Sequence, residues 1–192
     1  MLLLFTSAAL AATTPRFPEL TSEEWDRVHA GEVVMRAQTD GSRVTATGII
    51  KVDAAPEVLW PAVLDIEARI PEGKTLTGVK EYKREGPNTW FLEVDMEVVG
   101  ADLKIHHRYD WDPARDQATY SLDPARPNDL AVADGWYLVR RAEGGSLLVF
   151  QSVTEAKVPV PGWVKRWLAR DQMEELLDGI RARAEKGPER RG

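Results

Sequence analysis

Two consecutive runs of alternating residues near the middle of the chain constrain its fold most. From 90 to 98, and again from 103 to 111, apolar or aromatic side chains occupy every second position. A period of two is typical of a β-strand that buries one face. Gly100 and Ala101 separate the runs, and a two-residue loop with glycine first fits a type II′ turn. The stretch therefore predicts an antiparallel hairpin with one polar, solvent-exposed face and one apolar face.

The turn also predicts which residues face each other. With Val99 opposite Asp102, opposite charges meet at each step of the outer face. The expected pairs are Glu97–Lys104, Asp95–His106 and Glu93–Arg108. Each pair favours this register by about 0.2–1 kcal/mol, and a slip of one residue would exchange the two faces. The inner face, with His107 and Tyr109 near its middle, needs another part of the chain to cover it.

Length and composition exclude several classes of function. A chain of 192 residues, 43% apolar and 29% charged, is typical of one globular domain with room for a core or a cavity. The net charge of −6 and the pI near 5.2 argue against a nucleic-acid partner. The chain has no cysteine, which excludes disulfides, thiolate catalysis and cysteine-bound metal. Its three scattered histidines give no metal spacing, and no cofactor is indicated.

Residues 1–11 differ from the rest of the chain. They are apolar and uncharged, and they end in Ala9-Leu10-Ala11, a small-x-small pattern. This is similar to the end of a secretory signal peptide cleaved after Ala11. We therefore expect export to the periplasm or the medium. The alternative is an apolar N-terminus of a cytoplasmic protein.

The remaining residues predict an α+β order of elements. A linker, a short helix from Ser22 to about Ala30 and an extended arm are expected within 12–39. Strands are expected at 43–52, 75–84, the central hairpin, 118–122, 130–140 and 147–154, with a helix that starts at Pro56 and is disturbed by Pro61. Residues 162–186 carry an apolar stripe at helical spacing, and 188–192 form a polar tail. Because one long helix cannot fill a strongly curved sheet along its whole length, a cavity is expected between them.

Several short motifs within residues 40–187 resemble a known superfamily. A strand ends in the Ala-Pro-Glu helix start at 55–57, followed by Trp60 and by Leu-Asp-Ile-Glu at 64–67. Gly135-Trp136 stands in the penultimate strand, and Pro159-x-Pro161 leads into the last helix. The chain is similar in these respects to the START-like (SRPBCC) superfamily, which includes polyketide cyclases, ubiquinone-binding proteins and lipid-transfer START domains. The segment 20–40 and Pro61 depart from the pattern.

The resemblance implies the helix-grip fold, in which a curved antiparallel sheet wraps around a long C-terminal helix. It also implies a cavity for a hydrophobic small molecule such as a lipid, a quinone or a polyketide-like aromatic. Such folds host binders, carriers and enzymes, so three functions stay open. The first is a non-enzymatic binder or carrier. The second is a cyclase or aromatase-like enzyme, and the third is a structural or partner-binding domain whose cavity is filled.

The expected cavity wall consists of inward-facing residues of the strands and the last helix. They are Trp90, Leu92, Val94, Met96, Ile105, His107, Tyr109, Trp111, Tyr120, Trp136, Met173 and Leu177. We expect no catalytic residue among them, because a lone histidine without a second positioned partner is a weak sign of acid–base chemistry. His106 is expected on the surface opposite Asp95. Both faces of 130–154 are apolar, so the inward side of this hairpin stays open.

Trp163 and Trp167 begin the last helix beside basic residues, off its apolar stripe. They either pack against the first helices or form a rim that touches a membrane surface transiently, since tryptophan beside basic residues suits an anionic interface. The sequence does not predict an oligomeric state.

Overall fold

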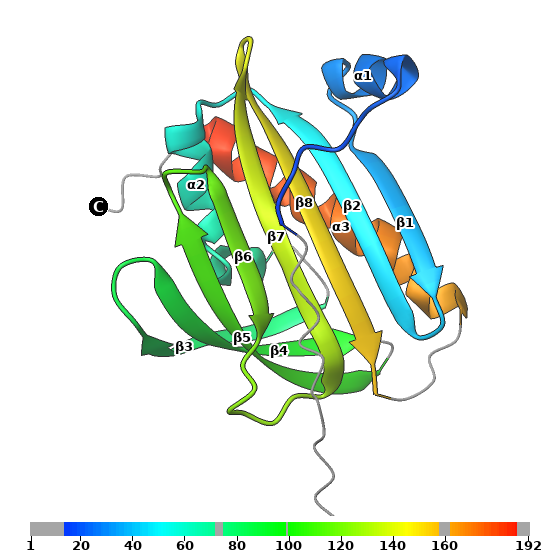
Figure 1. Ribbon diagram of the computed structural model, residues 1–192, viewed down its shortest axis with the longest axis vertical. Coiled ribbons are helices and arrows are strands. Elements are labelled where there is room, and N and C mark those ends of the chain that lie inside the picture. Colours follow the sequence, from blue (N-terminus) through cyan, green and yellow to red (C-terminus); the bar gives the residue numbers. More distant parts are fainter. Residues whose placement is uncertain (1–13, 72–74, 99, 158–161, 188–192) are drawn as a thin grey trace, which may run out of the picture.

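An eight-stranded antiparallel sheet curves around one long helix (Figure 1). The computed structural model describes residues 14–71, 75–98, 100–157 and 162–187, with the backbone alone for 162–169. The elements in chain order are α1 (Ser22–His29), β1 (Val34–Asp40), β2 (Arg43–Val52), α2 (Pro56–Leu64), η1 (Glu67–Arg69), β3 (Leu76–Arg84), β4 (Thr89–Val98), β5 (Ala101–Asp112), β6 (Gln117–Leu122), β7 (Leu130–Ala142), β8 (Gly145–Ala156) and α3 (Gly162–Lys186). This order confirms the predicted α+β class. The expected signal peptide, the tail and the side chains of Trp163 and Trp167 lie outside the described residues.

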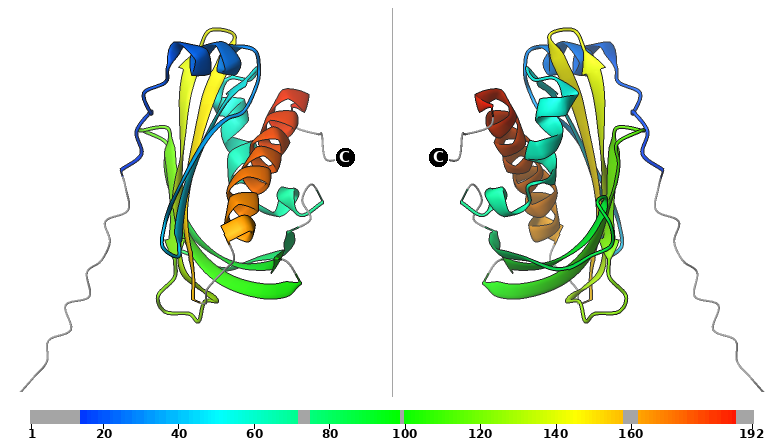
Figure 2. Two further views of the ribbon diagram at one scale, coloured as in Figure 1. Left: turned by 90° about the vertical axis from the view of Figure 1, so that its right-hand side faces the viewer. Right: turned by 90° about the vertical axis from the view of Figure 1, so that its left-hand side faces the viewer.

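The strand order is β1-β2-β8-β7-β6-β5-β4-β3, so each strand after β2 pairs with its sequence neighbour except where β8 returns to β2. Figure 2 shows α2 and α3 on the concave side of the sheet and α1 on the opposite side. The extended arm predicted before residue 40 is the edge strand β1, which pairs with β2 along its whole length. None of the described helices is long and apolar enough to cross a membrane.

Local sequence explains where the first two helices begin. Thr21 and Glu24 form a reciprocal capping box, in which each side chain accepts the backbone N–H of the other, at 3.2 and 2.9 Å. Pro56 occupies the first position of α2, where its missing N–H has no helical partner to lose. The helix continues through Pro61 to Leu64. Pro61 is exposed, and the start of α2 is regular, so the expected disturbance is not found there.

The predicted register of the β4–β5 hairpin is wrong by two residues. Val98 faces Ala101, and Gly100 takes the second central position of the turn with φ +76°. The sequence interpretation placed the glycine at the first central position, whereas the left-handed conformation is needed at the second. Since a shift of two keeps the side-chain alternation, the inner and outer faces are as predicted.

The charge pairs of the outer face change accordingly. Lys104 lies between two carboxylates, with its Nζ 2.7 Å from Glu93 Oε1 and 3.2 Å from Asp95 Oδ1. Arg108 pairs with Asp110 on its own strand at 2.8 Å, not with Glu93. Acidic residues thus face basic ones at Asp95–Lys104 and Glu93–His106, but Glu97 faces Asp102, so the expected opposite charges at each step are found only in part.

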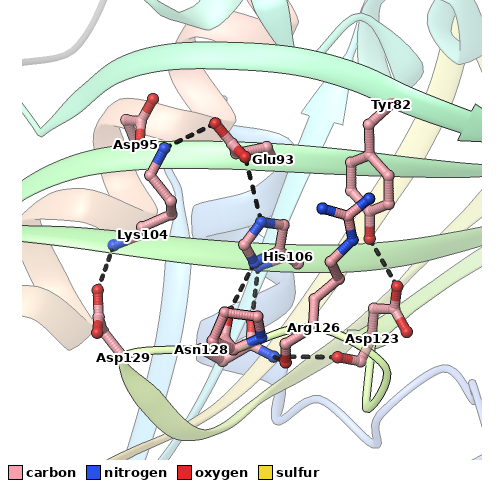
Figure 3. A network of polar contacts seen from close by, with 10 residues as sticks. Tyr82, Glu93, Asp95, Lys104, His106, Asp123, Arg126, Asn128 and Asp129 are labelled. Carbon is pink, nitrogen blue, oxygen red and sulfur yellow. Dashed lines mark hydrogen bonds and ion pairs between the residues drawn. The ribbon is translucent and has the colours of Figure 1, made fainter.

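His106 is buried, which corrects its predicted surface position. Its side chain leaves the outer face of β5, but residues 123–129 cover it, so that only 3% of the residue is exposed (Figure 3). Its Nδ1 lies 2.7 Å from the Pro127 carbonyl oxygen and its Nε2 lies 3.2 Å from Glu93 Oε2. Asn128 Oδ1 accepts the His106 backbone N–H at 2.6 Å. The covering loop is thus held to the sheet by polar contacts that the period of the strand does not reveal.

A second apolar cluster on the convex side decides the orientation of the β7–β8 hairpin. Val28 of α1, with Phe17, Leu20 and Trp25, packs against outward-facing side chains of the sheet. These are Val34, Ile49, Trp136, Leu138, Leu147 and Val149. The N-terminal segment buries the outer face, so apolar residues stand on both faces of the two strands. Trp136 therefore points away from the cavity, and its predicted place in the cavity wall is wrong.

Two glycines let large groups approach the sheet. A Cβ on Gly48 would lie 2.5 Å from Leu177 Cδ1 and 2.7 Å from Met173 Sδ, so α3 rests directly on the backbone of β2. A Cβ on Gly135 would overlap the Gln151 carbonyl oxygen and lie 2.5 Å from the Tyr120 hydroxyl oxygen. Gly135 thus leaves the space that the Tyr120 ring fills.

We predict that Gly135→Ala destabilises the protein by about 1–3 kcal/mol, because the added methyl overpacks a backbone carbonyl that cannot move alone. Urea denaturation measures the free energy of unfolding. Gly78→Ala is the matched control, since its Cβ would meet only the Asp95 side chain, at 3.1 Å. Equal stability of the two variants would contradict the close approach at Gly135.

Candidate functional site

A cavity of about 310 Å³ lies between α3 and the concave face of the sheet. Its wall is largely aliphatic and aromatic. The lining residues include Val44, Ala46, Ile66, Leu76, Val94, Met96, Val98, Leu103, Ile105, Leu130, Ala133, Ala156, Met173 and Leu176, with Arg69, His107, Tyr109, Tyr120, Tyr137 and Phe150. A concave apolar site with a few polar groups is the usual form of a small-molecule binding site.

The lining changes character along the strands. Val98, Leu103, Leu130 and Ala156 lie at the strand tips, whereas Tyr109 and Tyr137 lie well inside β5 and β7. Tyr109 lies six positions after Leu103, which is about 20 Å of extended backbone. The cavity is therefore long enough to have two distinct parts. The part near the strand tips is mainly aliphatic with the Ser42 and Thr154 hydroxyls, and the part further in is aromatic and includes Arg69.

Aromatic rings form a continuous layer beneath the inner part of the cavity. Tyr109 and Tyr120 stack with ring centroids 5.4 Å apart, and Tyr137 and Phe150 stack at 4.5 Å. The Tyr120 and Phe150 centroids, 6.2 Å apart, join the two pairs. Burial raises the pKa of the Tyr109 and Tyr120 phenols above their usual range, so both hydroxyls stay protonated at neutral pH.

His107 lies in this layer with its imidazole edge against the rings of Tyr109 and Tyr120, at centroid distances of 5.8 and 5.1 Å. Neither ring nitrogen makes a well-aligned hydrogen bond to a described residue, although the Ala133 backbone is near enough to favour the charged ring slightly. Burial outweighs that effect and lowers the pKa of His107 to about 4. At neutral pH the imidazole is uncharged.

Arg69 contributes the guanidinium of the cavity wall. It ends η1, and its Nη1 donates to the Tyr137 hydroxyl at 3.1 Å while its Nη2 donates to the Val63 carbonyl at 2.5 Å. The Arg69 Nε is buried, and no acceptor for it lies in the described residues. Its charge also lies 5.5 Å from the Tyr137 ring centroid.

The structure places the predicted wall residues in four different environments. Val94, Met96, Ile105, His107, Tyr109, Tyr120 and Met173 line the cavity. Trp90, Leu92 and Trp111 instead line a second cleft, against Asp65, Glu67 and Glu81. Leu177 is fully buried between α3 and the sheet without lining either space, and Trp136 lies in the convex-side cluster. Near Trp136, the Gln151 side chain also points outward: its Oε1 accepts from Trp136 Nε1 and its Nε2 donates to Thr47 Oγ1, at 3.1 Å each.

Sequence reasoning missed Arg69, Tyr137 and Phe150. The direction in which Tyr137 and Phe150 point was not predicted, because both faces of their strands are apolar. The apolar side chains of Phe17, Leu20 and Trp25 were a usable signal, since a short N-terminal segment with three large apolar residues has to cover some surface. Arg69 stands in a short helical turn with no periodicity, where the sequence does not say which way a side chain points.

Comparison with solved structures identifies the fold. No protein-family model and no curated protein match the chain. A START superfamily protein from Mycobacterium smegmatis superposes with a TM-score of 0.61 at 22% identity, covering 74% of this chain and 97% of that one. The STAR-related lipid transfer protein from Xanthomonas axonopodis gives a TM-score of 0.67 at 11% identity, over 79% and 93%. The fold is START-like. The two-domain aromatase/cyclase BexL shares it with a TM-score of 0.56 at 12% identity, over 79% of this chain and 52% of that one.

The START-like fold confirms the resemblance drawn from the sequence motifs, including the helix-grip arrangement of sheet and C-terminal helix. These identities are low, so the likeness concerns the fold and not a particular ligand. The cavity described above occupies the space between the two parts of the grip.

We predict that acidification weakens the fold through His107. The imidazole titrates near pH 6.5 in the unfolded chain and near pH 4 in the folded one, so the unfolded state binds more protons between these values. Stability should therefore fall as the pH drops below 6.5, by about 2 kcal/mol at pH 5 from this residue. The variant His107→Phe has no group to protonate here, so its free energy of unfolding should fall by correspondingly less.

Urea denaturation at pH 7.5, 6 and 5 measures this difference for wild type and His107→Phe. His29→Gln, at the exposed histidine of α1, should follow the wild type. Parallel pH dependences of wild type and His107→Phe would contradict the prediction, because they would mean that the folded protein protonates His107 as readily as the unfolded chain does.

Proposed function

We propose that the protein binds and carries a single hydrophobic small molecule in the cavity between α3 and the sheet. The observation that supports this most directly is the cavity itself, a space of about 310 Å³ inside a core that is otherwise well buried. Interiors of globular proteins are normally close-packed, and a void lined by apolar groups stays dry and takes up apolar guests. The START superfamily and lipid-transfer proteins that share the fold are in keeping with this function.

The alternative of a purely structural domain has less support. A filled core would bring α3 against β4 and β5, but α3 packs mainly on β2, with further contacts to β1 and α2. The inner halves of β4 and β5 thus face the cavity and not the helix. An apolar surface of this extent is costly to leave in contact with water, and a bound apolar molecule removes that cost.

The enzyme alternative, a cyclase or aromatase-like activity, rests on His107 and Tyr109. An efficient general acid or base has a pKa near the working pH. Burial moves the pKa of His107 down and that of Tyr109 up, away from neutrality in both cases. The two groups are therefore better suited to forming the polar part of the cavity wall than to transferring protons.

The place of action is part of the same proposal. If residues 1–11 are removed on export, the carrier works outside the cytoplasm, and Trp163 and Trp167 would offer a surface for brief contact with a membrane. N-terminal sequencing of the protein from its native host tests the first point, because Met1 or Leu2 at the N-terminus would rule out cleavage.

We predict that Val94→Trp removes ligand binding without unfolding the protein. Val94 is buried and lines the cavity, so an indole at this position would occupy the ligand's space. The free energy of unfolding should change by less than about 1 kcal/mol, whereas overpacking of a solid core costs about 1–3 kcal/mol. Affinity for Nile red, an uncharged apolar dye, should fall at least about tenfold.

Dye titration and urea denaturation on the same samples decide the matter. Glu97→Trp is the matched control, because Glu97 lies on the same strand but is exposed and faces outward. It should bind the dye as the wild type does. A wild type that binds no dye, together with a large loss of stability in Val94→Trp, would leave only the structural role.

A further inference from the structure

The cavity contains a cation, Arg69, that has no anionic partner in the part of the chain that the structure describes. Arg69 lines the cavity, and no carboxylate of the described residues lies within 4 Å of its guanidinium. Asp65 and Glu67 precede it closely in the chain, but both are exposed, and Asp65 Oδ1 accepts the Ala68 backbone N–H at 3.1 Å. The partners of Arg69 are the neutral Tyr137 hydroxyl and the neutral Val63 carbonyl.

A guanidinium in this position carries an energetic cost that its neutral partners do not remove. An arginine keeps its charge at any working pH, and a charge in apolar surroundings is unfavourable unless an opposite charge accompanies it. Two of its five N–H groups are used by Tyr137 and Val63, and the buried Nε–H has no acceptor among the described residues. If Arg69 served only to hold η1 against α2, a neutral donor would do so at less cost.

The surrounding wall indicates which end of a ligand meets Arg69. Tyr137, its hydrogen-bond partner, lies seven residues along β7 from Leu130, which is about 23 Å of extended strand. The strand tips around Leu130 present Val98, Leu103 and Ala156 to the cavity. Glu175 is the only acidic side chain of the described lining, and it is exposed. The positive charge of the described lining therefore lies at the inner part of the cavity. The lining toward the strand tips is uncharged and mainly aliphatic, with the hydroxyls of Ser42, Thr75 and Thr154.

We propose that the ligand is an anionic amphiphile, held with its acidic head against Arg69 and its apolar tail toward the strand tips. This inference rests on the proposed function, since it specifies the ligand of the same cavity. A carboxylate or a phosphate can each accept two parallel N–H bonds from a guanidinium. Either group would supply the anionic acceptor that Arg69 lacks among the described residues. The uncharged His107 and the protonated phenols of Tyr109 and Tyr120 add no negative charge that would oppose the head.

The experiment compares ligands that differ only in the head. Lauric acid, dodecyl phosphate and methyl laurate share the same alkyl length and are titrated against the protein loaded with Nile red. The wild type should bind one or both acids about tenfold to a hundredfold more tightly than the uncharged ester, as expected for a charge-assisted hydrogen bond. Which acid binds more tightly distinguishes a carboxylate head from a phosphate head.

Arg69→Met should abolish the preference for the acids and leave the affinity for methyl laurate unchanged. Arg69→Gln keeps neutral donors near Tyr137 and Val63, so it should fold even if Arg69→Met does not, and it should also lose the preference. Arg183→Met is the matched control, because Arg183 donates from Nη2 to the Ala62 carbonyl at 3.0 Å but does not line the cavity. It should retain the preference.

Two failures can be told apart. If the wild type binds Nile red but takes up acids and ester equally, the anionic head is refuted while the apolar binding function stands. If the wild type binds neither dye nor any of the three ligands, the carrier function itself is refuted. A preference for the acids that persists in Arg69→Gln would place the head elsewhere in the cavity and overturn the role of Arg69.

Discussion

The seating of α3 on β2 is the contact on which the rest of the structure depends. Gly48 has no side chain, so Leu177 and Met173 of α3 rest directly on the strand backbone there. The same helix packs on α2 and β1, that is, on one half of a strongly curved sheet. Because a straight helix cannot follow that curvature, the other half of the concave face stays apart from it and the cavity results.

The convex face is closed by separate pieces of chain, and this affects the cavity indirectly. Segment 14–30 covers the outer side of β2, β7 and β8, and the loop 123–129 covers His106 on β5. Where these pieces lie, the sheet has packing contacts on its outer side in addition to its contacts with α3. The sheet can therefore leave its inner face open to a ligand and still have a core on its other side.

The polar groups of the cavity differ in their charge. His107, Tyr109 and Tyr120 are uncharged at neutral pH, since burial shifts the pKa of each away from 7. Arg69 is the exception, because a guanidinium stays charged wherever it is placed. Buried charges without partners are rare in cores, where they lower stability, so their presence in a ligand cavity is better explained by the ligand than by the fold. The positive charge of the described lining thus comes from one residue of a three-residue turn.

Periodicity in the sequence determined most of the secondary structure and the general form of the site. Alternation at 90–111 is a local property of each strand, so it showed the hairpin and the correct inner face, which includes Val94, Ile105 and Tyr109. The position of Gly100 in the turn was not determined by it, and the predicted register was wrong by two residues. Helix capping at Thr21 and Pro56 was equally local and equally visible.

Tertiary structure alone decided which side of β7 and β8 faces the cavity, and where Arg69 points. Trp136 and Tyr137 are adjacent and both are buried, one under the N-terminal segment and one beneath the cavity. Burial of both faces removes the polar side that alternation needs as a reference. Arg69 owes its place to the packing of η1 between α2 and the sheet, which brings Val63 and Tyr137 to the same guanidinium from residues 6 and 68 positions away. Contacts between residues so far apart in the chain leave no trace in local sequence patterns.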